Sequence, residues 1–181
     1  SDGFVSSATN EMNVSTAYTW DARANRTSMV QAVGTPLARS TTTSWEEIGK
    51  LPHHIEYPNL AVDFDYDAQG RLQSRTETDT TTQTIPYSTA GQTRTWTYAW
   101  NGNGRLLSVN GPKGLDVNGK DDVTTFTYDA NGNLLTSTNA LGHVTHFTDY
   151  DANGRPGKMT DPNGIDTLYT YDQLGRLATV T

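Results

Sequence analysis

The chain has 181 residues and a formal net charge of −7, with 13 Lys and Arg against 20 Asp and Glu. This charge argues against nucleic-acid binding, which needs concentrated Lys and Arg, and no run of about 18 apolar residues is present to span a membrane. A hydrophobic content of 34% predicts a folded chain with a thin core, and the absence of cysteine excludes a disulfide framework. Because the chain begins at Ser1 without a visible secretory signal, we expect it to be a piece of a longer protein.

The first predicted elements, in residues 1–65, are two degenerate copies of a short repeat that starts at an aromatic residue. The copies are Trp20-Asp21-Ala22-Arg23-Ala24-Asn25-Arg26 and Trp45-Glu46-Glu47-Ile48-Gly49-Lys50-Leu51. The first copy departs from the later copies at Ala24, which stands where those have Gly, and at Arg26, which stands where those have Leu.

Residues 66–181 hold the clear copies, so residues 1–181 are predicted to form a single repeat-built region. The pattern is aromatic-acid-x-x-Gly-Arg-Leu, and its copies start at Tyr66, Trp100, Tyr128, Tyr150 and Tyr171. The shortest spacing is about 21 residues (45 to 66, and 150 to 171), too short for a globular domain. Insertions near residues 73–90 and 115–122 predict longer loops or hairpins on one rim.

Each copy predicts a tight turn after its aromatic residue. An Asp side chain at the start of a turn can accept hydrogen bonds from the backbone, and Gly supplies the left-handed conformation that closes a type I turn with a bulge. The Arg that follows is expected to face solvent or a cross-strand partner. The predicted turn residues are Asp67, Gly70, Asp129, Gly132, Asp151, Gly154, Asp172 and Gly175, and Gly49 and Gly104 hold the same position.

A second turn is predicted fourteen positions after the aromatic residue, so each unit has two turns and two short strands. Glycine occupies this place as Gly34, Gly114, Gly142 and Gly164, and Asn59 substitutes for it as a residue that tolerates positive φ.

Aromatic residues recur with period two before each first turn, as in Trp96-Thr97-Tyr98, and this alternation indicates a strand with one packed and one wet face. Phe147 and Tyr150 are three apart, which predicts a β-bulge near Asp149. The residues predicted to pack between repeats are Trp20, Trp45, Tyr66, Trp100, Tyr128, Tyr150 and Tyr171.

The motif Tyr-Asp-x-x-Gly-Arg-Leu at this spacing resembles the RHS repeat, also called the YD repeat. The resemblance is closest at Tyr66, Tyr128, Tyr150 and Tyr171, and Asn133 and Pro156 depart from it. In that family the repeats form strips of β-hairpins that spiral into a hollow shell, which encloses a C-terminal toxic domain in bacterial polymorphic and insecticidal toxins. The teneurins use it in adhesion. The resemblance implies an all-β fold, in which antiparallel β-hairpin repeats form a twisted strip that is a section of an RHS-type spiral shell.

Three patterns invite a chemical interpretation, and each is better explained by structure. Residues 161–165 are similar to the self-cleavage sequence of bacterial RHS proteins, but a complete repeat follows them, so Asp161-Pro162-Asn163-Gly164 is predicted to be a turn. The Asp-rich segments 116–122 and 129–133 lack the Gly and Glu spacing of an EF-hand loop. We predict no catalytic, metal or cofactor site.

Histidines form the third pattern: His53 and His54 are adjacent, and His143 and His146 are close together. No further ligand stands at a metal-binding spacing, so we interpret these residues as surface or packing residues. A Ser-His-Asp triad is defined by geometry, and no nucleophile elbow favours one here.

The resemblance implies a structural, non-enzymatic role in a bacterial secreted or cell-surface toxin-delivery protein. The partners would be neighbouring repeats and an enclosed toxin domain of the same protein, without nucleic acid. The alternative is a carbohydrate-binding or adhesion module at the cell surface, with Trp96 as the candidate glycan contact. We also expect the sheet edges of this piece to pair with a second copy.

Overall fold

The computed structural model describes residues 3–47, 50–115, 119 and 121–181. These residues contain fifteen β-strands and no helix, hence none long and apolar enough to cross a bilayer. The strand pairs of the described residues are antiparallel, which confirms the predicted all-β fold of antiparallel hairpins. The chain divides into two compact units, Ser1–Thr95 and Trp96–Thr181, and the division falls inside strand β8 (Thr93–Trp100).

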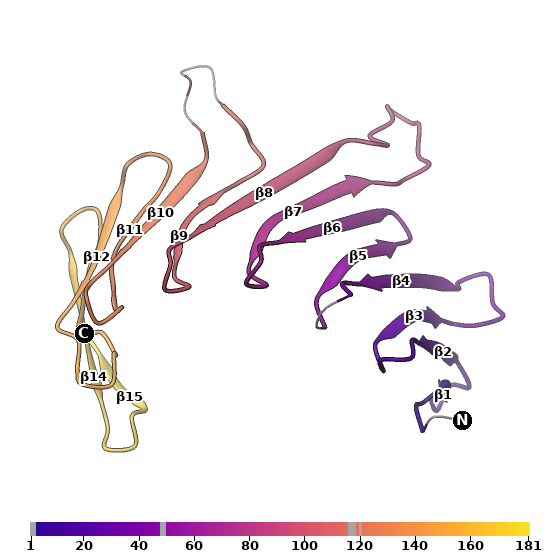
Figure 1. Ribbon diagram of the computed structural model, residues 1–181, viewed down its shortest axis with the longest axis horizontal. Helices are drawn as coiled ribbons and strands as arrows, with labels where there is room; N and C mark the ends of the chain where they lie inside the picture. Colours follow the sequence, from indigo (N-terminus) through magenta and orange to yellow (C-terminus); the bar gives the residue numbers. More distant parts are fainter. Residues whose placement is uncertain (1–2, 48–49, 116–118, 120) are drawn as a thin grey trace. The chain divides into compact units, whose positions relative to one another are not determined.

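The first unit is a sheet in which strand order follows chain order, as Figure 1 shows. Each strand pairs with the next one along the chain, so every connection is a hairpin. Its strands are β1 (Ser7–Thr9), β2 (Ser15–Trp20), β3 (Arg26–Gln31), β4 (Arg39–Trp45), β5 (Pro52–Tyr57), β6 (Leu60–Tyr66) and β7 (Leu72–Asp79).

The second unit continues the same hairpin connectivity from β8 onward. Its further strands are β9 (Leu106–Asn110), β10 (Val123–Tyr128), β11 (Leu134–Thr138), β12 (Val144–Thr148), β13 (Lys158–Thr160), β14 (Asp166–Tyr171) and β15 (Leu177–Val180). The sequence gives no sign of the division near residue 95, and a single repeat-built region over 1–181 stays a prediction.

In strands β8 and β14, half-buried residues alternate with exposed ones. In β8, Trp96, Tyr98 and Trp100 are half-buried, whereas Thr97 and Ala99 between them are exposed. Strand β14 has the same alternation. Successive side chains of a strand point to opposite faces, so all the aromatic residues of β8 lie on one face of the sheet.

The core is thin, as the composition predicts. In the described residues the buried hydrophobic side chains are Ala61, 6% exposed, and Val62, 3% exposed, both in β6, and no side chain is less than 2% exposed. A single-layer sheet has no second layer to cover its faces. Each hairpin is therefore stabilised mainly by the hairpins on either side of it.

The first of the two insertions is partly strand. Strand β7 runs to Asp79, so the first part of the insertion at 73–90 is strand and the connection to β8 spans residues 80–92. Strands lengthen there because cross-strand pairing with β6 continues to Leu60. Much of the second insertion, at 115–122, lies outside the described residues.

The repeat at Trp45 has a longer turn than its spacing suggests. Trp45 pairs with Pro52, seven residues on, whereas Tyr66 pairs with Leu72, six residues on. The N–H of Glu46 donates to the carbonyl of Leu51 at 2.9 Å. Leu51 therefore holds the place that Arg has in the clear copies, not the place of Leu, and Gly49 lies outside the described residues.

The expected positive φ at Asn59 is wrong, because Asn59 is not among the residues in that conformation. Tyr57 pairs with Leu60 across a two-residue turn. Pro58 holds the first central position of this turn, where its fixed negative φ suits a type I turn that leaves Asn59 at negative φ.

The irregularity predicted near Asp149 is present. Asp149 follows β12 with a φ of 57°. The N–H of Gly157 donates to the carbonyls of Thr148 at 3.1 Å and of Asp149 at 3.0 Å. Two consecutive residues thus face one on the other strand, which is the arrangement of a β-bulge.

Candidate functional site

In six of the repeats the first turn is held by the side chain of its leading Asp or Asn. The N–H of Asp67 donates to the carbonyl of Arg71, and the N–H of Gly70 to the carbonyl of Asp67, each at 2.9 Å. Asp67 Oδ1 accepts the N–H groups of Gln69 and Arg71, also at 2.9 Å, and Gly70 has a φ of 76°. Oδ1 accepts the corresponding N–H groups at Asp21, Asn101, Asp129, Asp151 and Asp172, with positive φ at Ala24, Gly104, Gly132, Gly154 and Gly175.

The Arg of the motif pairs with the Asp of its own turn in three copies, a partner that the sequence analysis did not name. Arg176 is also 74% exposed and faces solvent as expected. Arg71 Nε donates to Asp67 Oδ2 at 2.6 Å. The same ion pair joins Arg155 to Asp151 and Arg176 to Asp172, at 2.7 Å each, and amide groups replace it at Asn25 with Asp21 and Asn133 with Asp129. Asn133 therefore keeps the donor that the turn requires.

These contacts keep the turn carboxylates ionised. The N–H of Arg176, and then its guanidinium, hold the pKa of Asp172 below its ordinary value. The N–H of Arg155 lowers the pKa of Asp151 in the same way, against an opposing effect of burial. Hydrogen bonds to a charged carboxylate favour the charged form.

The same turn occurs where the sequence analysis did not place it. Asn10 Oδ1 accepts the N–H groups of Met12 at 3.1 Å and Val14 at 2.9 Å, and Asn13 takes positive φ in the place of Gly. An Asx residue followed three positions later by Asn, which tolerates this conformation, was the signal that could have located it.

Consecutive repeats are joined by the polar atom of each aromatic residue. Tyr66 OH donates to the carbonyl of Pro52 at 2.9 Å, at the start of the strand that follows the preceding turn. Tyrosine and tryptophan make equivalent contacts throughout: Trp20 to Val5, Trp45 to Arg26, Tyr128 to Leu106, Tyr150 to Leu134 and Tyr171 to Pro156. These six hydrogen bonds form what we call the aromatic ladder, three in each unit.

Arginine adds a second link between repeats. The Arg155 guanidinium lies 4.7 Å from the ring centroid of Tyr171, and that of Arg105 lies 6.0 Å from the ring of Tyr128. Arg105 also donates to the carbonyl of Asn131 at 3.2 Å. A guanidinium over an aromatic ring is attracted by the negative face of that ring.

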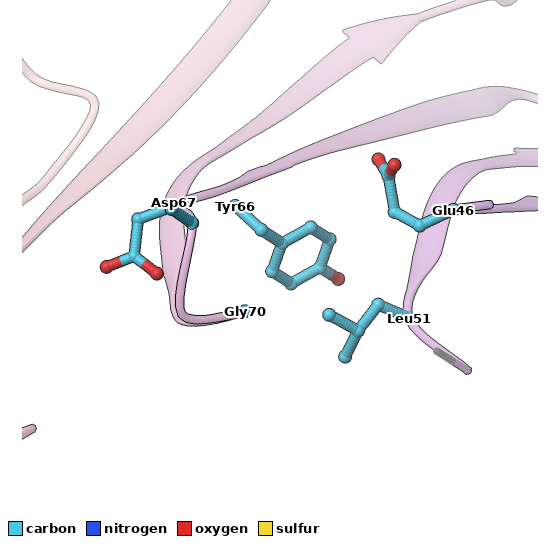
Figure 2. Close-up of a pocket in the computed structure, with 6 residues that line it drawn as sticks. Glu46, Leu51, Tyr66, Asp67 and Gly70 are labelled. Atoms are coloured by element: carbon cyan, nitrogen blue, oxygen red, sulfur yellow. The ribbon is translucent and has the colours of Figure 1, made fainter. Parts of the chain in front are cut away.

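The interface between the Trp45 and Tyr66 repeats contains a cavity of about 270 Å³ (Figure 2). In Figure 2 the Tyr66 ring lies between the turn of Asp67 and Gly70 and the side chains of Glu46 and Leu51. Burial, and then the charge of Glu46, raise the pKa of Tyr66.

Three known proteins resemble this chain. Double-stranded DNA deaminase toxin A of Burkholderia cenocepacia (strain H111) is 28% identical over 75% of this chain, which spans 8% of that protein. The crystal structure of TcdB2-TccC3 without its hypervariable C-terminal region matches 96% of this chain, with a TM-score of 0.67 and 14% identity. The match covers 9% of the matched TcdB2-TccC3 chain. The Tc holotoxin pore of Photorhabdus luminescens matches 97% of this chain over 10% of its own chain, with a TM-score of 0.51 and 14% identity. At this identity the structural likeness shows the fold alone.

The RHS Repeat family matches residues 128–166 and 150–181 of this chain. The copies that start at Tyr128, Tyr150 and Tyr171 lie in these residues. Residues 128–181 of this chain are therefore RHS repeats by sequence. The aromatic, the acid and the Gly of the RHS motif are thus the residues of the aromatic ladder and of the turns described above.

Residues 161–165 form the second turn of an RHS repeat. Asp161 Oδ1 accepts the N–H groups of Asn163 and Ile165 at 2.8 Å, and Gly164 has a φ of 81°. Asn139 holds the turn before it in the same manner. The Asp-Pro sequence has the geometry of the other RHS turns.

His53 contacts the cavity-lining Glu46, and no histidine of the described residues lines the cavity itself. His54 Nδ1 is 2.6 Å from Asp63 Oδ1 and its Nε2 is 3.3 Å from Glu56 Oε2, and the Asp63 hydrogen bond is the main cause that raises the pKa of His54. Ser44 is paired opposite His54 in the next strand, but both ring nitrogens already face carboxylates. The sequence analysis missed this cluster because its register is set by the short turn at residues 58–59.

The described residues contain no group of three or more His, Asp or Glu side chains arranged to hold a metal ion. The Asp-rich segment 116–122 lies largely outside them. Trp96 is half-buried on the same face of β8 as Tyr98 and Trp100. Its role as a glycan contact stays a prediction, and none of the three relatives is named for carbohydrate binding.

Proposed function

We propose that this chain is a structural RHS-repeat segment of a bacterial secreted or cell-surface toxin-delivery protein. It forms part of a β-shell that encloses a C-terminal toxic domain of the same protein, and it has no catalytic role of its own. The aromatic ladder is the observation that carries this proposal, because it joins successive hairpins of each unit into a wall one sheet thick.

Two further observations support a wall. The residues that repeat most are engaged in turns and in contacts between repeats, which leaves them unsuited to act on a substrate. The names of the matched proteins include a toxin and a toxin pore, and one of those structures is described without a C-terminal region.

Limited proteolysis of the full-length protein tests enclosure. We expect a C-terminal region beyond this segment to resist protease while the wall is intact. The double variant Asp151→Ala and Asp172→Ala, which removes the carboxylates that hold two adjacent turns, should open the wall and make that region cleavable. The control is Asp65→Asn, which lies outside the turns. Equal protease sensitivity of the wild type and the double variant would contradict enclosure.

Self-association through the sheet edges is a further part of the proposal. All residues of β1 and β15, the outer strands of the described sheet, are exposed. Unpaired edge strands can pair with another chain. Sedimentation velocity over a range of concentrations should show oligomers of the isolated chain, and a strictly monomeric profile would count against this expectation.

A further inference from the structure

The Arg of one repeat fills a place against the turn of the next repeat. Arg155 pairs with Asp151 of its own turn and lies over the ring of Tyr171 in the following one. Gly175 lies so close to this guanidinium that a Cβ atom there would collide with it. Arg105 lies against Tyr128 and Gly132 in the same way.

At the interface between the Trp45 and Tyr66 repeats, Leu51 stands at the position that Arg155 holds between the Tyr150 and Tyr171 repeats. The carbonyl of Leu51 accepts the N–H of Glu46, as the carbonyl of Arg155 accepts the N–H of Asp151. A Cβ atom built on Gly70 would meet the Leu51 Cδ1 at an ordinary 3.5 Å. The leucine is uncharged and shorter than arginine, and the cavity of about 270 Å³ lies beside it.

The remaining partners of a guanidinium are all present at this cavity. Glu46 follows the aromatic residue as Asp151 does, and its Oε1 is 3.0 Å from His53 Nδ1. Within the described residues no hydrogen bond is found at Oε2, so this oxygen can accept from a second donor. The Asp67 carboxylate is paired with Arg71 and points away from the Tyr66 ring (Figure 2). The cavity therefore combines one carboxylate, one aromatic ring and the space of one side chain.

We propose that this cavity binds a guanidinium group supplied by an arginine side chain of a partner polypeptide. The guanidinium pairs with Glu46 and stacks on Tyr66, and so takes the place that Arg155 has against Tyr171. Arginine fits better than lysine because its planar, weakly hydrated group can stack and pair at once. Free arginine fits less well, because its own carboxylate would be repelled by Glu46 and Asp67.

Titration of the chain with N-acetyl-arginine amide, followed by amide NMR, tests this site. We expect shifts at Gly70, Tyr66 and Glu46 with a dissociation constant on the order of 1 mM, as suits one ion pair and one stacked ring. N-acetyl-citrulline amide has nearly the same shape without the charge and should cause no shift, while N-acetyl-lysine amide and free arginine should bind more weakly. Equal shifts with the citrulline compound would overturn the proposal.

Variants locate the binding. Glu46→Gln should weaken it at least tenfold, and Leu51→Arg should abolish it, because the new side chain fills the cavity from within the chain. Conversely, Arg155→Leu should create a second site, seen as new shifts at Tyr171 and Gly175. Dispersion of the NMR spectrum shows that each variant is folded. Binding that persists in Leu51→Arg would contradict the assignment even if Arg155→Leu fails to fold.

Discussion

The aromatic position of the repeat accepts tyrosine and tryptophan because each joins a flat apolar ring to one hydrogen-bond donor at its far end. Trp45 Nε1 and Tyr66 OH both reach a main-chain carbonyl of the preceding repeat, at 3.1 and 2.9 Å. Phenylalanine would keep the ring and lose the donor. The position therefore selects for a donor as well as for apolar area.

Replacing Tyr171 by phenylalanine isolates this donor. Tyr171→Phe removes the hydrogen bond to Pro156 and leaves the ring beneath Arg155. We expect a loss of about 1 kcal/mol in the free energy of unfolding, the usual net value of one hydrogen bond. Urea unfolding measures it. Tyr98→Phe is the control, since no hydrogen bond from this hydroxyl is found within the described chain. An equal loss there would show that the loss at Tyr171 does not come from the hydrogen bond to Pro156.

A second prediction at the residue scale concerns the backbone conformation of Ala24. It holds the place of the turn Gly with a φ of 67°. Left-handed backbone costs a residue with a Cβ roughly 1–2 kcal/mol. Ala24→Gly should therefore raise the free energy of unfolding by about 1 kcal/mol, after allowing for the greater freedom of Gly in the unfolded chain.

The matched control for Ala24→Gly is Ala22→Gly, two residues earlier in the same turn and without positive φ. Its replacement should lower stability slightly, because only the cost in the unfolded state applies. If both variants lower the melting temperature alike, the strain at Ala24 does not exist.

At the scale of the hairpin, the turn carboxylates make stability depend on pH. The pKa of Asp172 is lowered in the folded chain, mainly by the N–H and then by the guanidinium of Arg176. A lowered pKa stabilises the fold above the unfolded value of about 3.9, and this contribution is lost as the pH falls through the folded pKa. We expect the hairpin of β14 and β15 to weaken below about pH 4.

Asp172→Asn provides the comparison, because Asn139 shows that an amide oxygen can hold the same turn without titrating. The wild type should be more stable than this variant at pH 7, and the difference should shrink as the pH is lowered toward 3. Urea midpoints at pH 7, 5 and 3 measure it. A difference that does not change with pH would contradict a role for the charge.

Local features of the hairpins could be predicted from sequence, and non-local ones could not. The alternation of Trp96, Tyr98 and Trp100 follows from the two-residue period of a strand, and the all-β fold follows from its recurrence. The pairing of His54 with Asp63 depends on the register between strands β5 and β6. The two-residue turn between Tyr57 and Leu60 sets this register. Such contacts need the strand pairing to be known first.

The position after the turn Gly shows the same limit. The sequence gives Arg71 and Leu51 no visible relation, because the turn after Trp45 is one residue longer than the motif allows. Only the hydrogen bond from Glu46 to Leu51 shows that the two residues hold equivalent places. The cavity beside Leu51 was therefore outside the reach of pattern analysis.

At the scale of the whole molecule, a thin sheet of hairpins should have stability terms that depend on neighbours alone. Tyr66→Phe and Tyr171→Phe lie in different units, and their losses in free energy of unfolding should add within about 0.5 kcal/mol. Tyr150→Phe and Tyr171→Phe lie in consecutive repeats, where the losses should not add. A double-mutant cycle in urea measures both pairs, and strong coupling across the units would contradict a nearest-neighbour description.

The aromatic ladder also has a direction. In each of its hydrogen bonds the acceptor carbonyl precedes the donor along the chain, as Pro156 precedes Tyr171. A chain that leaves the ribosome N-terminus first presents every acceptor before its donor is made. Each new hairpin thus emerges beside a finished docking edge, and the wall can assemble in the order of its synthesis without waiting for residues still to come.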